Sequence, residues 1–207
     1  MTWNWQLPDW PNFVFDPEAI RPLEERFLQA SGQLLGIVQH LGKHDRETFQ
    51  IRLISEEALK TSAIEGEILD RESVQSSIRR HFGLQPGKRA KTPAAERGVS
   101  ALMFDLFQNF DAPLTHKLIE RWHHALLSHR KDLTGPGKYR ADEAPMQVVS
   151  GPVHRPKVHF EAPSSSTVRK EMTRFLKQYA VLGQTTGPLV HSALVHLHFL
   201  AIHPFAD

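Results

Sequence analysis

One segment near the end of the chain constrains the fold more than any other. Residues 189–202, LVHSALVHLHFLAI, hold one serine and three histidines among otherwise apolar side chains. A helix that is apolar on all sides belongs in a core rather than on a surface. This run is shorter than the roughly 18 residues that a membrane span requires. It therefore predicts a core helix within a mainly α protein.

The core helix is expected to end at His203. Pro204 disfavours helical backbone at the residue before it, which places His203 where a rigid helix meets a loop. A histidine there can accept a proton from an attacking hydroxyl. We expect Phe205 to bury its ring and pin the loop, while Asp207 points outward. On spacing alone, a helix-capping histidine and a solvated aspartate explain the same residues.

Three further histidines lie on the core helix. His191 and His198 are seven residues apart, or roughly 10.5 Å along a helix axis. One ion cannot bridge that distance, and the spacing disfavours a zinc site. We expect His191, His196 and His198 to be core residues whose rings hydrogen-bond to backbone carbonyls.

Composition narrows the class of protein. Among 207 residues, 25 lysines and arginines face 23 aspartates and glutamates, which gives no case for nucleic-acid binding. The absence of cysteine excludes disulfides, thiolate metal sites and cysteine nucleophiles. The N-terminus lacks the pattern of a signal peptide, and no apolar run is long enough for a membrane. We expect a soluble, cytoplasmic protein that does not contact a membrane.

Helical periodicity and punctuation divide the chain into seven helices and one hairpin. The first sixteen residues, rich in tryptophan and phenylalanine, are expected to form an ordered arm on a helical surface. Asp16, Asp70, Thr92 and Thr115 are expected to cap helices. The expected helices are 17–41, 46–67, 70–82, 93–107, 115–126, 166–182 and 188–202, and the expected strands are 146–149 and 157–160.

The polar, basic connector from Gln85 to Lys91 is the best candidate for a domain boundary. It divides the chain into an arm and helical region, residues 1–90, and a second domain, residues 91–207.

The motifs together resemble the Fic family. His203-Pro204-Phe205-Ala206-Asp207 matches the first five positions of its signature, H-x-F-x-D/E-G-N-G-R-x-x-R. Gly137 and Arg140, followed by residues 146–151, resemble the G-x-x-R and flap hairpin that precede the signature. The resemblance covers about residues 92–207. It implies a Fic-type helical bundle with one β-hairpin flap, preceded by a helical region.

Typical Fic proteins transfer AMP from ATP to protein hydroxyls. The resemblance implies that His203 is the general base, that Asp207 binds Mg²⁺ and that Phe205 anchors the loop. The substrate would be a Ser, Thr or Tyr hydroxyl of a target protein or of the chain itself. The flap would accept the target as an added strand. Its residues are Met146, Gln147, Val148, Val149, Ser150 and Gly151.

An inhibitory motif lies upstream. Residues 61–66, TSAIEG, fit the pattern S/T-x-x-x-E-G/N of self-restrained Fic proteins at Thr61, Glu65 and Gly66. In the family, this glutamate pairs with the last arginine of the signature and keeps it from the ATP γ-phosphate. A helix-terminal glutamate before a glycine C-cap is the alternative interpretation.

Other functions remain open on the sequence. Relatives of Fic transfer UMP, phosphate or phosphocholine, and a non-catalytic module could use the arm and the hairpin to bind a partner. The second half of the signature would follow Asp207, so the chain as printed is expected to be inactive in nucleotide transfer. A homodimer is also open, because many relatives dimerise.

Overall fold

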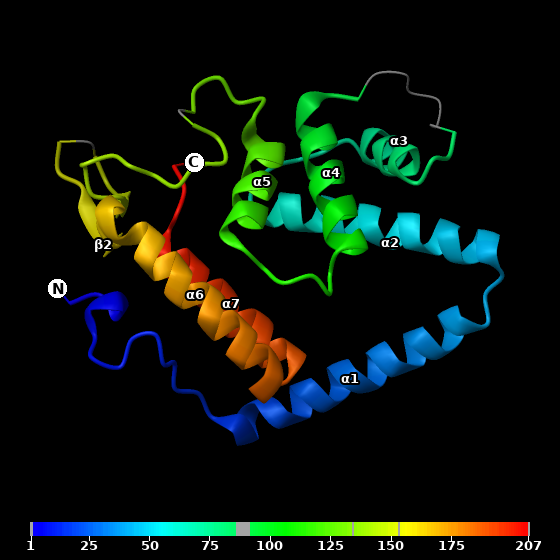
Figure 1. The fold of residues 1–207 in the computed structure, drawn as a ribbon, viewed down its shortest axis with the longest axis horizontal. Coiled ribbons are helices and arrows are strands. Elements are labelled where there is room, and N and C mark those ends of the chain that lie inside the picture. The colour runs from blue at the N-terminus through cyan, green and yellow to red at the C-terminus, as the bar shows by residue number, and fades with distance from the viewer. Residues whose placement is uncertain (1, 86–91, 134, 153, 207) are drawn as a thin grey trace. The chain divides into compact units, whose positions relative to one another are not determined.

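The computed structural model describes residues 2–85, 92–133, 135–152 and 154–206. Over these ranges the protein is mainly α, with one antiparallel β-hairpin, as predicted (Figure 1). No helix in the described part of the chain is long and apolar enough to cross a bilayer. The elements are η1 (Asn4–Gln6), α1 (Pro17–Gln39), α2 (Lys43–Ile64), α3 (Arg71–His81), α4 (Ala94–Gln108), α5 (His116–Leu127), β1 (Gln147–Ser150), β2 (Lys157–Glu161), α6 (Ser165–Thr185) and α7 (Pro188–Ile202).

The chain forms two compact units. The first unit joins Met1–Gln33 to Lys138–Asp207, and the second is Leu34–Gly137. Residues from the beginning of the chain therefore pack with its last third. The connector expected at residues 85–91 lies almost entirely outside the described residues, and a domain boundary at residue 90 stays a prediction.

Helix caps follow the sequence at three of the four expected positions. The Asp16 carboxylate accepts a hydrogen bond from the Glu18 amide at 3.0 Å. Asp70 and Thr115 cap α3 and α5 in the same way, at 2.8 and 3.2 Å. The prediction for Thr92 is wrong. Pro93 is the N-cap of α4, and the Thr92 hydroxyl instead accepts a hydrogen bond from Arg80 of α3.

The core of the second unit lies among α2, α3 and α4. Apolar residues one helical turn apart on α2 and α3 face each other there, as three-and-four spacing predicts. Ile78 and Val74 are completely buried. The buried cluster consists of Ile51, Ile54, Ala58, Val74 and Ile78.

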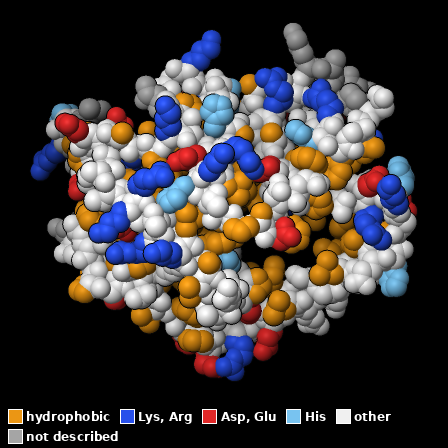
Figure 2. Space-filling model, in the orientation of Figure 1, with side chains coloured by type: hydrophobic (Ala, Val, Ile, Leu, Met, Phe, Trp, Pro, Cys, Tyr) orange, Lys and Arg blue, Asp and Glu red, His pale blue; other side chains and the backbone are white. Residues whose placement is uncertain are grey.

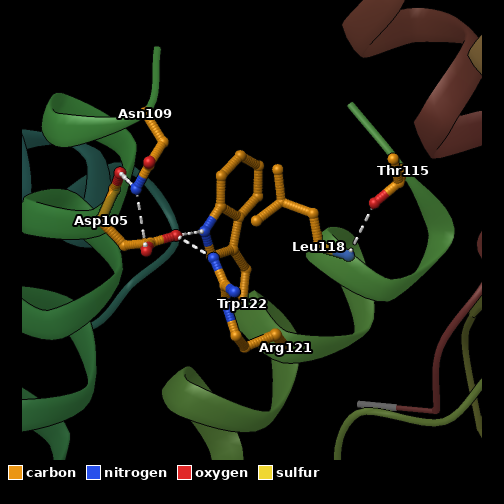
Figure 3. Close-up of polar contacts among 6 residues, drawn as sticks. All are labelled: Asp105, Asn109, Thr115, Leu118, Arg121 and Trp122. Carbon is orange, nitrogen blue, oxygen red and sulfur yellow. Dashed lines mark hydrogen bonds and ion pairs between the residues drawn. The ribbon is translucent and has the colours of Figure 1, made fainter. Parts of the chain in front are cut away.

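A carboxylate joins α4 to α5 in the second unit (Figure 3). Asp105 accepts hydrogen bonds from Arg121 Nη2 and Trp122 Nε1, both at 2.7 Å, and from Asn109 Nδ2 at 3.2 Å. Partial burial raises the pKa of Asp105, but the hydrogen bonds from Trp122 and Arg121 outweigh it, so the pKa lies below its usual value. The ionised carboxylate thus stabilises the packing of α5 on α4.

Replacing Asp105 with alanine should destabilise the protein by about 1 to 2 kcal/mol, because the Trp122 and Arg121 donors lose a shared charged acceptor. The midpoint of urea unfolding measures the change. Asp132→Ala is the matched control, since Asp132 is an exposed carboxylate whose ion pair is with the exposed Arg130. Equal midpoint shifts for the two variants would contradict this role of Asp105.

In the first unit α6 packs along α7 (Figure 1). Basic side chains gather over the outer face of α6, where Arg169, Lys170, Arg174 and Lys177 are exposed (Figure 2). The prediction that α7 is buried on all sides is only partly right, since Leu197 and Leu200 are 45% and 51% exposed. α6, η1, Trp10 and Glu24 contact α7, and the side of the helix that carries Ser192, Ala193, His196, Leu197 and Leu200 is exposed.

His198 is the most enclosed histidine of α7. Its ring is 2% exposed and lies edge-on to Trp10, at 4.9 Å, and to Phe175, at 5.3 Å. Its Nε2 has no hydrogen-bond partner among the residues that the structure describes. The expected bond to a carbonyl is therefore wrong here, because aromatic rings surround the imidazole. His191 does bond to the Tyr179 carbonyl at 3.2 Å, as predicted, whereas His196 is exposed.

Burial, with a smaller contribution from the Arg174 charge, lowers the pKa of His198 to about 4. In the unfolded chain this histidine takes up a proton near pH 6.5. Between pH 6.5 and 4 the unfolded state therefore binds more protons, and the free energy of unfolding should fall as the pH falls.

The His198 contribution to this loss should be about 1 to 3 kcal/mol. His198→Phe should reduce the loss of stability between pH 6.5 and 4, measured by urea unfolding at each pH. His196→Gln, at an exposed position, should behave as the unmodified protein does. An unchanged pH dependence in His198→Phe would show that another group controls it.

Candidate active site

His203 ends α7 in an unusual backbone conformation. Its φ is 45°, in the left-handed region, and its amide donates to the Phe199 carbonyl at 3.0 Å. It is the one non-glycine residue with positive φ among the described residues. Such a residue costs roughly 1–3 kcal/mol and persists only where its surroundings hold it. Pro204 accounts for the end of the helix, but the left-handed turn requires a further support.

Arg140 supplies that support. Its Nε donates to the His203 carbonyl at 2.7 Å, and its Nη2 donates to the Ile202 carbonyl at 3.3 Å and to the Pro163 carbonyl. Its backbone amide donates to the Pro204 carbonyl at 2.9 Å. The side chain is buried, with 7% of the residue exposed. One residue thus binds three consecutive carbonyls at the end of α7.

The charge of Arg140 suits its position. The last carbonyls of a helix have no partner within the helix, and they carry the negative end of the macrodipole. Burial lowers the pKa of the Arg140 guanidinium, and the nearby Asp142 charge partly offsets this effect. Arginine nevertheless stays protonated in proteins, so a cation lies at the negative end of α7.

Glu24 of α1 holds the opposite end of α7. Its carboxylate accepts hydrogen bonds from the amides of Leu189, at 3.1 Å, and Val190, at 3.4 Å. A Cβ at position 187 would lie 2.4 Å from the Glu24 Cδ, so a larger residue there would displace the Glu24 carboxylate from the end of α7. α7 therefore has an anion at its positive end and a cation at its negative end.

Phe205 is 5% exposed. Its ring lies 5.3 Å from that of Tyr139 and 6.5 Å from that of Phe199. The half-buried His203 lines a hollow of about 80 Å³ together with Phe199, Leu200, Pro204 and Phe205. The structure thus brings His203 and Phe205 together in one small loop over the end of α7.

The expected flap is the hairpin β1–β2. Val148 pairs with Phe160 and Val149 with Val158, with a bulge between the two pairs. Val148 and Val149 are each 49% exposed. Within the described residues β1 pairs only with β2, so its other edge offers unpaired backbone groups to an extended segment.

The expected metal ligand, Asp207, lies outside the described residues. The described residues hold no group of three histidines, aspartates or glutamates that could bind a metal ion. Mg²⁺ in nucleotide sites typically uses one or two carboxylates together with phosphate oxygens and water. A single carboxylate two residues after the buried Phe205 ring fits that donor set.

The expected inhibitory residues lie at the end of α2, within the second unit. Thr61 donates to the Glu57 carboxylate at 3.2 Å. Glu65 is the C-cap, and Gly66 follows with a φ of 86°, which is the glycine-capped helix end of the alternative interpretation. The Glu65 side chain is exposed and has no hydrogen bond or ion pair among the described residues. A helix-end geometry and an inhibitory role are compatible.

Sequence reasoning missed the contacts that hold α7. Arg140 was noted as part of G-x-x-R, but no pattern showed that its side chain binds the loop at His203. Glu24 gave no signal, because it lies 165 residues before Leu189. The arginine of G-x-x-R and a helix that ends before a proline were the two signals that could have suggested the first contact.

Replacing Arg140 with glutamine should destabilise the protein by roughly 2 to 4 kcal/mol, because the carbonyls of Ile202 and His203 lose their charged donor while they stay buried. Chemical unfolding measures the loss. The control is Arg155→Gln, which changes an exposed arginine near the flap. Unfolding midpoints that match for both variants would refute the role of Arg140.

Comparison with known proteins identifies two regions. Residues 113–207 match the Fic/DOC family, and residues 3–84 match a domain of unknown function, DUF4172. No match to the chain was found among the curated proteins.

Solved structures share the fold. A Fic family protein from Desulfovibrio desulfuricans has a TM-score of 0.61 and 23% identity, over 95% of this chain and 55% of that chain. A Fic domain containing signaling protein from Bacteroides thetaiotaomicron has a TM-score of 0.59 and 19% identity, over 83% of this chain and 63% of that chain. The chain thus spans little more than half the length of these proteins.

The family match covers α5, the flap, α6, α7 and the loop after it. All the elements of the candidate site that surround His203 lie within it. Residues 113–207, which carry the candidate site around His203, therefore match the Fic/DOC family model.

Proposed function

We propose that this protein is a Fic-type transferase that moves AMP from ATP to a hydroxyl of a target protein. The observation that carries the proposal is the position of His203. It lies at the end of a core helix, in a left-handed turn held by Arg140, beside a small hollow. A general base needs this kind of fixed position on a rigid element.

In the proposed reaction His203 accepts the proton of a Ser, Thr or Tyr hydroxyl. The hydroxyl oxygen forms a bond to the α-phosphorus of ATP, and the bond from that phosphorus to the bridging oxygen breaks. Pyrophosphate leaves with the electron pair, and AMP stays on the target. Asp207 would hold Mg²⁺, which supplies positive charge to the phosphates.

The flap would orient the acceptor. An extended target segment can add to the free edge of β1 through backbone hydrogen bonds. Such bonds recognise an extended backbone rather than one particular side chain. The half-exposed Val148 and Val149 supply apolar contacts along this strand. The hydroxyl would thereby reach His203 from a fixed direction. The same strand could accept a segment of another copy of the chain, which allows self-modification.

Glu65 would restrain the enzyme. Its carboxylate is exposed and unpaired among the described residues, so it is available to an arginine. A bidentate arginine–carboxylate pair is strong enough to compete with a phosphate for the same guanidinium. In the proposal, the last arginine of the signature is that partner in the full-length protein.

Full-length protein with Glu65→Gly should become labelled, or should label other proteins, with AMP from ATP labelled at the α-phosphate in the presence of Mg²⁺. Adding His203→Ala should lower the rate by about 10²- to 10⁴-fold, the typical contribution of a general base. Intact-protein mass spectrometry identifies the adduct. Circular dichroism and the unfolding midpoint show whether each variant remains folded.

Other outcomes separate the alternatives. An adduct of UMP, phosphate or phosphocholine from a panel of donors would keep the transferase and change its donor. The proposal is overturned if no donor is transferred and isothermal titration calorimetry detects no binding of ATP and Mg²⁺. A non-catalytic interaction module would then be the remaining interpretation.

A further inference from the structure

The N-terminal arm, residues 3–13, contacts the flap hairpin. The Trp3 ring lies edge-on to the Phe160 ring, with centroids 5.7 Å apart. Trp5 Nε1 donates to the Glu161 carbonyl at 2.6 Å. Both contacts are made to β2, so the arm lies against the strand that pairs with β1.

These contacts lie directly opposite the expected docking strand. Phe160 is the ladder partner of Val148, and Glu161 is the partner of Gln147. The Gln147 side chain also donates to the Glu161 carboxylate at 2.7 Å. A shift of β2 at Phe160 and Glu161 would therefore also move Gln147 and Val148, the first two residues of β1. A two-stranded hairpin is weak by itself and requires packing against another element.

The other end of the arm is fixed to the helices that position His203. Trp10 Nε1 donates to the Glu171 carboxylate of α6 at 3.2 Å, and the Trp10 ring packs on His198 of α7. Gln178 of α6 donates to the Pro11 carbonyl at 2.9 Å. The arm thus links β2 to α6 and α7 within the first unit.

We propose that the N-terminal arm positions the flap relative to α7, so that Trp3 and Trp5 determine how well an acceptor segment binds. Trp3 and Trp5 are positioning residues, because they act through β2. The proposal rests on the proposed function and extends it to the acceptor. It also assigns a role to the beginning of the region that matches a domain of unknown function.

A direct test is hydrogen exchange of the backbone amides of residues 147–150 and 157–161 in the full-length protein. Trp5→Phe keeps an aromatic ring and removes the N–H donor, and Trp3→Leu removes the ring contact. Both should raise exchange in the hairpin, by roughly two- to tenfold for the loss of one hydrogen bond. Trp122→Phe is the matched control, since it also removes an indole hydrogen bond, the one to Asp105, but lies in the second unit.

A kinetic measurement separates positioning from general stability. The enzyme carries Glu65→Gly, and the acceptor is a copy of the full-length protein with His203→Ala, which can be modified but cannot act as enzyme. Trp5→Phe should raise the acceptor concentration at half-maximal rate by roughly two- to tenfold, with the maximal rate kept within about twofold. Trp122→Phe should change neither value.

Unchanged hairpin exchange in Trp3→Leu and Trp5→Phe would overturn the proposal. A fall in the maximal rate at a constant half-maximal concentration would also overturn it. If the parent Glu65→Gly enzyme transfers nothing, the proposed function fails, and hydrogen exchange still decides whether the arm holds the flap.

Discussion

The guanidinium of Arg140 lies among the carbonyl oxygens at the C-terminal end of α7. It donates hydrogen bonds to the carbonyls of Ile202 and His203, and the Arg140 backbone amide donates to the Pro204 carbonyl. Without a buried cation these carbonyls would be desolvated and unpaired, and the left-handed turn at His203 would lack its main support. The position of the candidate base therefore depends on a residue 63 positions earlier in the chain.

The opposite end of α7 and the flap depend on the beginning of the chain. Glu24 caps the first amides of α7, and the arm ties β2 to α6 and α7. These residues precede Leu34, where the second unit begins, and they pack with Lys138–Asp207. The region matched by the domain of unknown function thus contributes to two units, and its first part packs around the candidate site in the first unit.

Local sequence patterns predicted the helices and the hairpin, but they did not predict the side-chain contacts between residues far apart in the sequence. Asp16, Asp70 and Thr115 marked helix starts because a cap acts within four residues. Glycines and prolines around residue 150 marked the hairpin for the same reason.

The missed features all depend on tertiary packing. The sequence predicts Thr92 as the N-cap of α4, because nothing in it shows that Arg80 donates a hydrogen bond to the Thr92 hydroxyl. The exposed face of α7, and the lack of a partner for His198 Nε2 within the described residues, likewise follow from which elements surround the helix. His203, Phe205 and the flap could be proposed from a motif, but the support from Arg140 required the structure.

Chemical rescue tests most directly whether Arg140 holds the site. In full-length protein with Glu65→Gly, the further change Arg140→Ala should greatly slow AMP transfer, and guanidinium ion at a concentration below the unfolding range should restore part of the rate. An equal concentration of sodium chloride should not. Transfer by the Arg140→Ala protein at the parent rate, without guanidinium, would contradict the account.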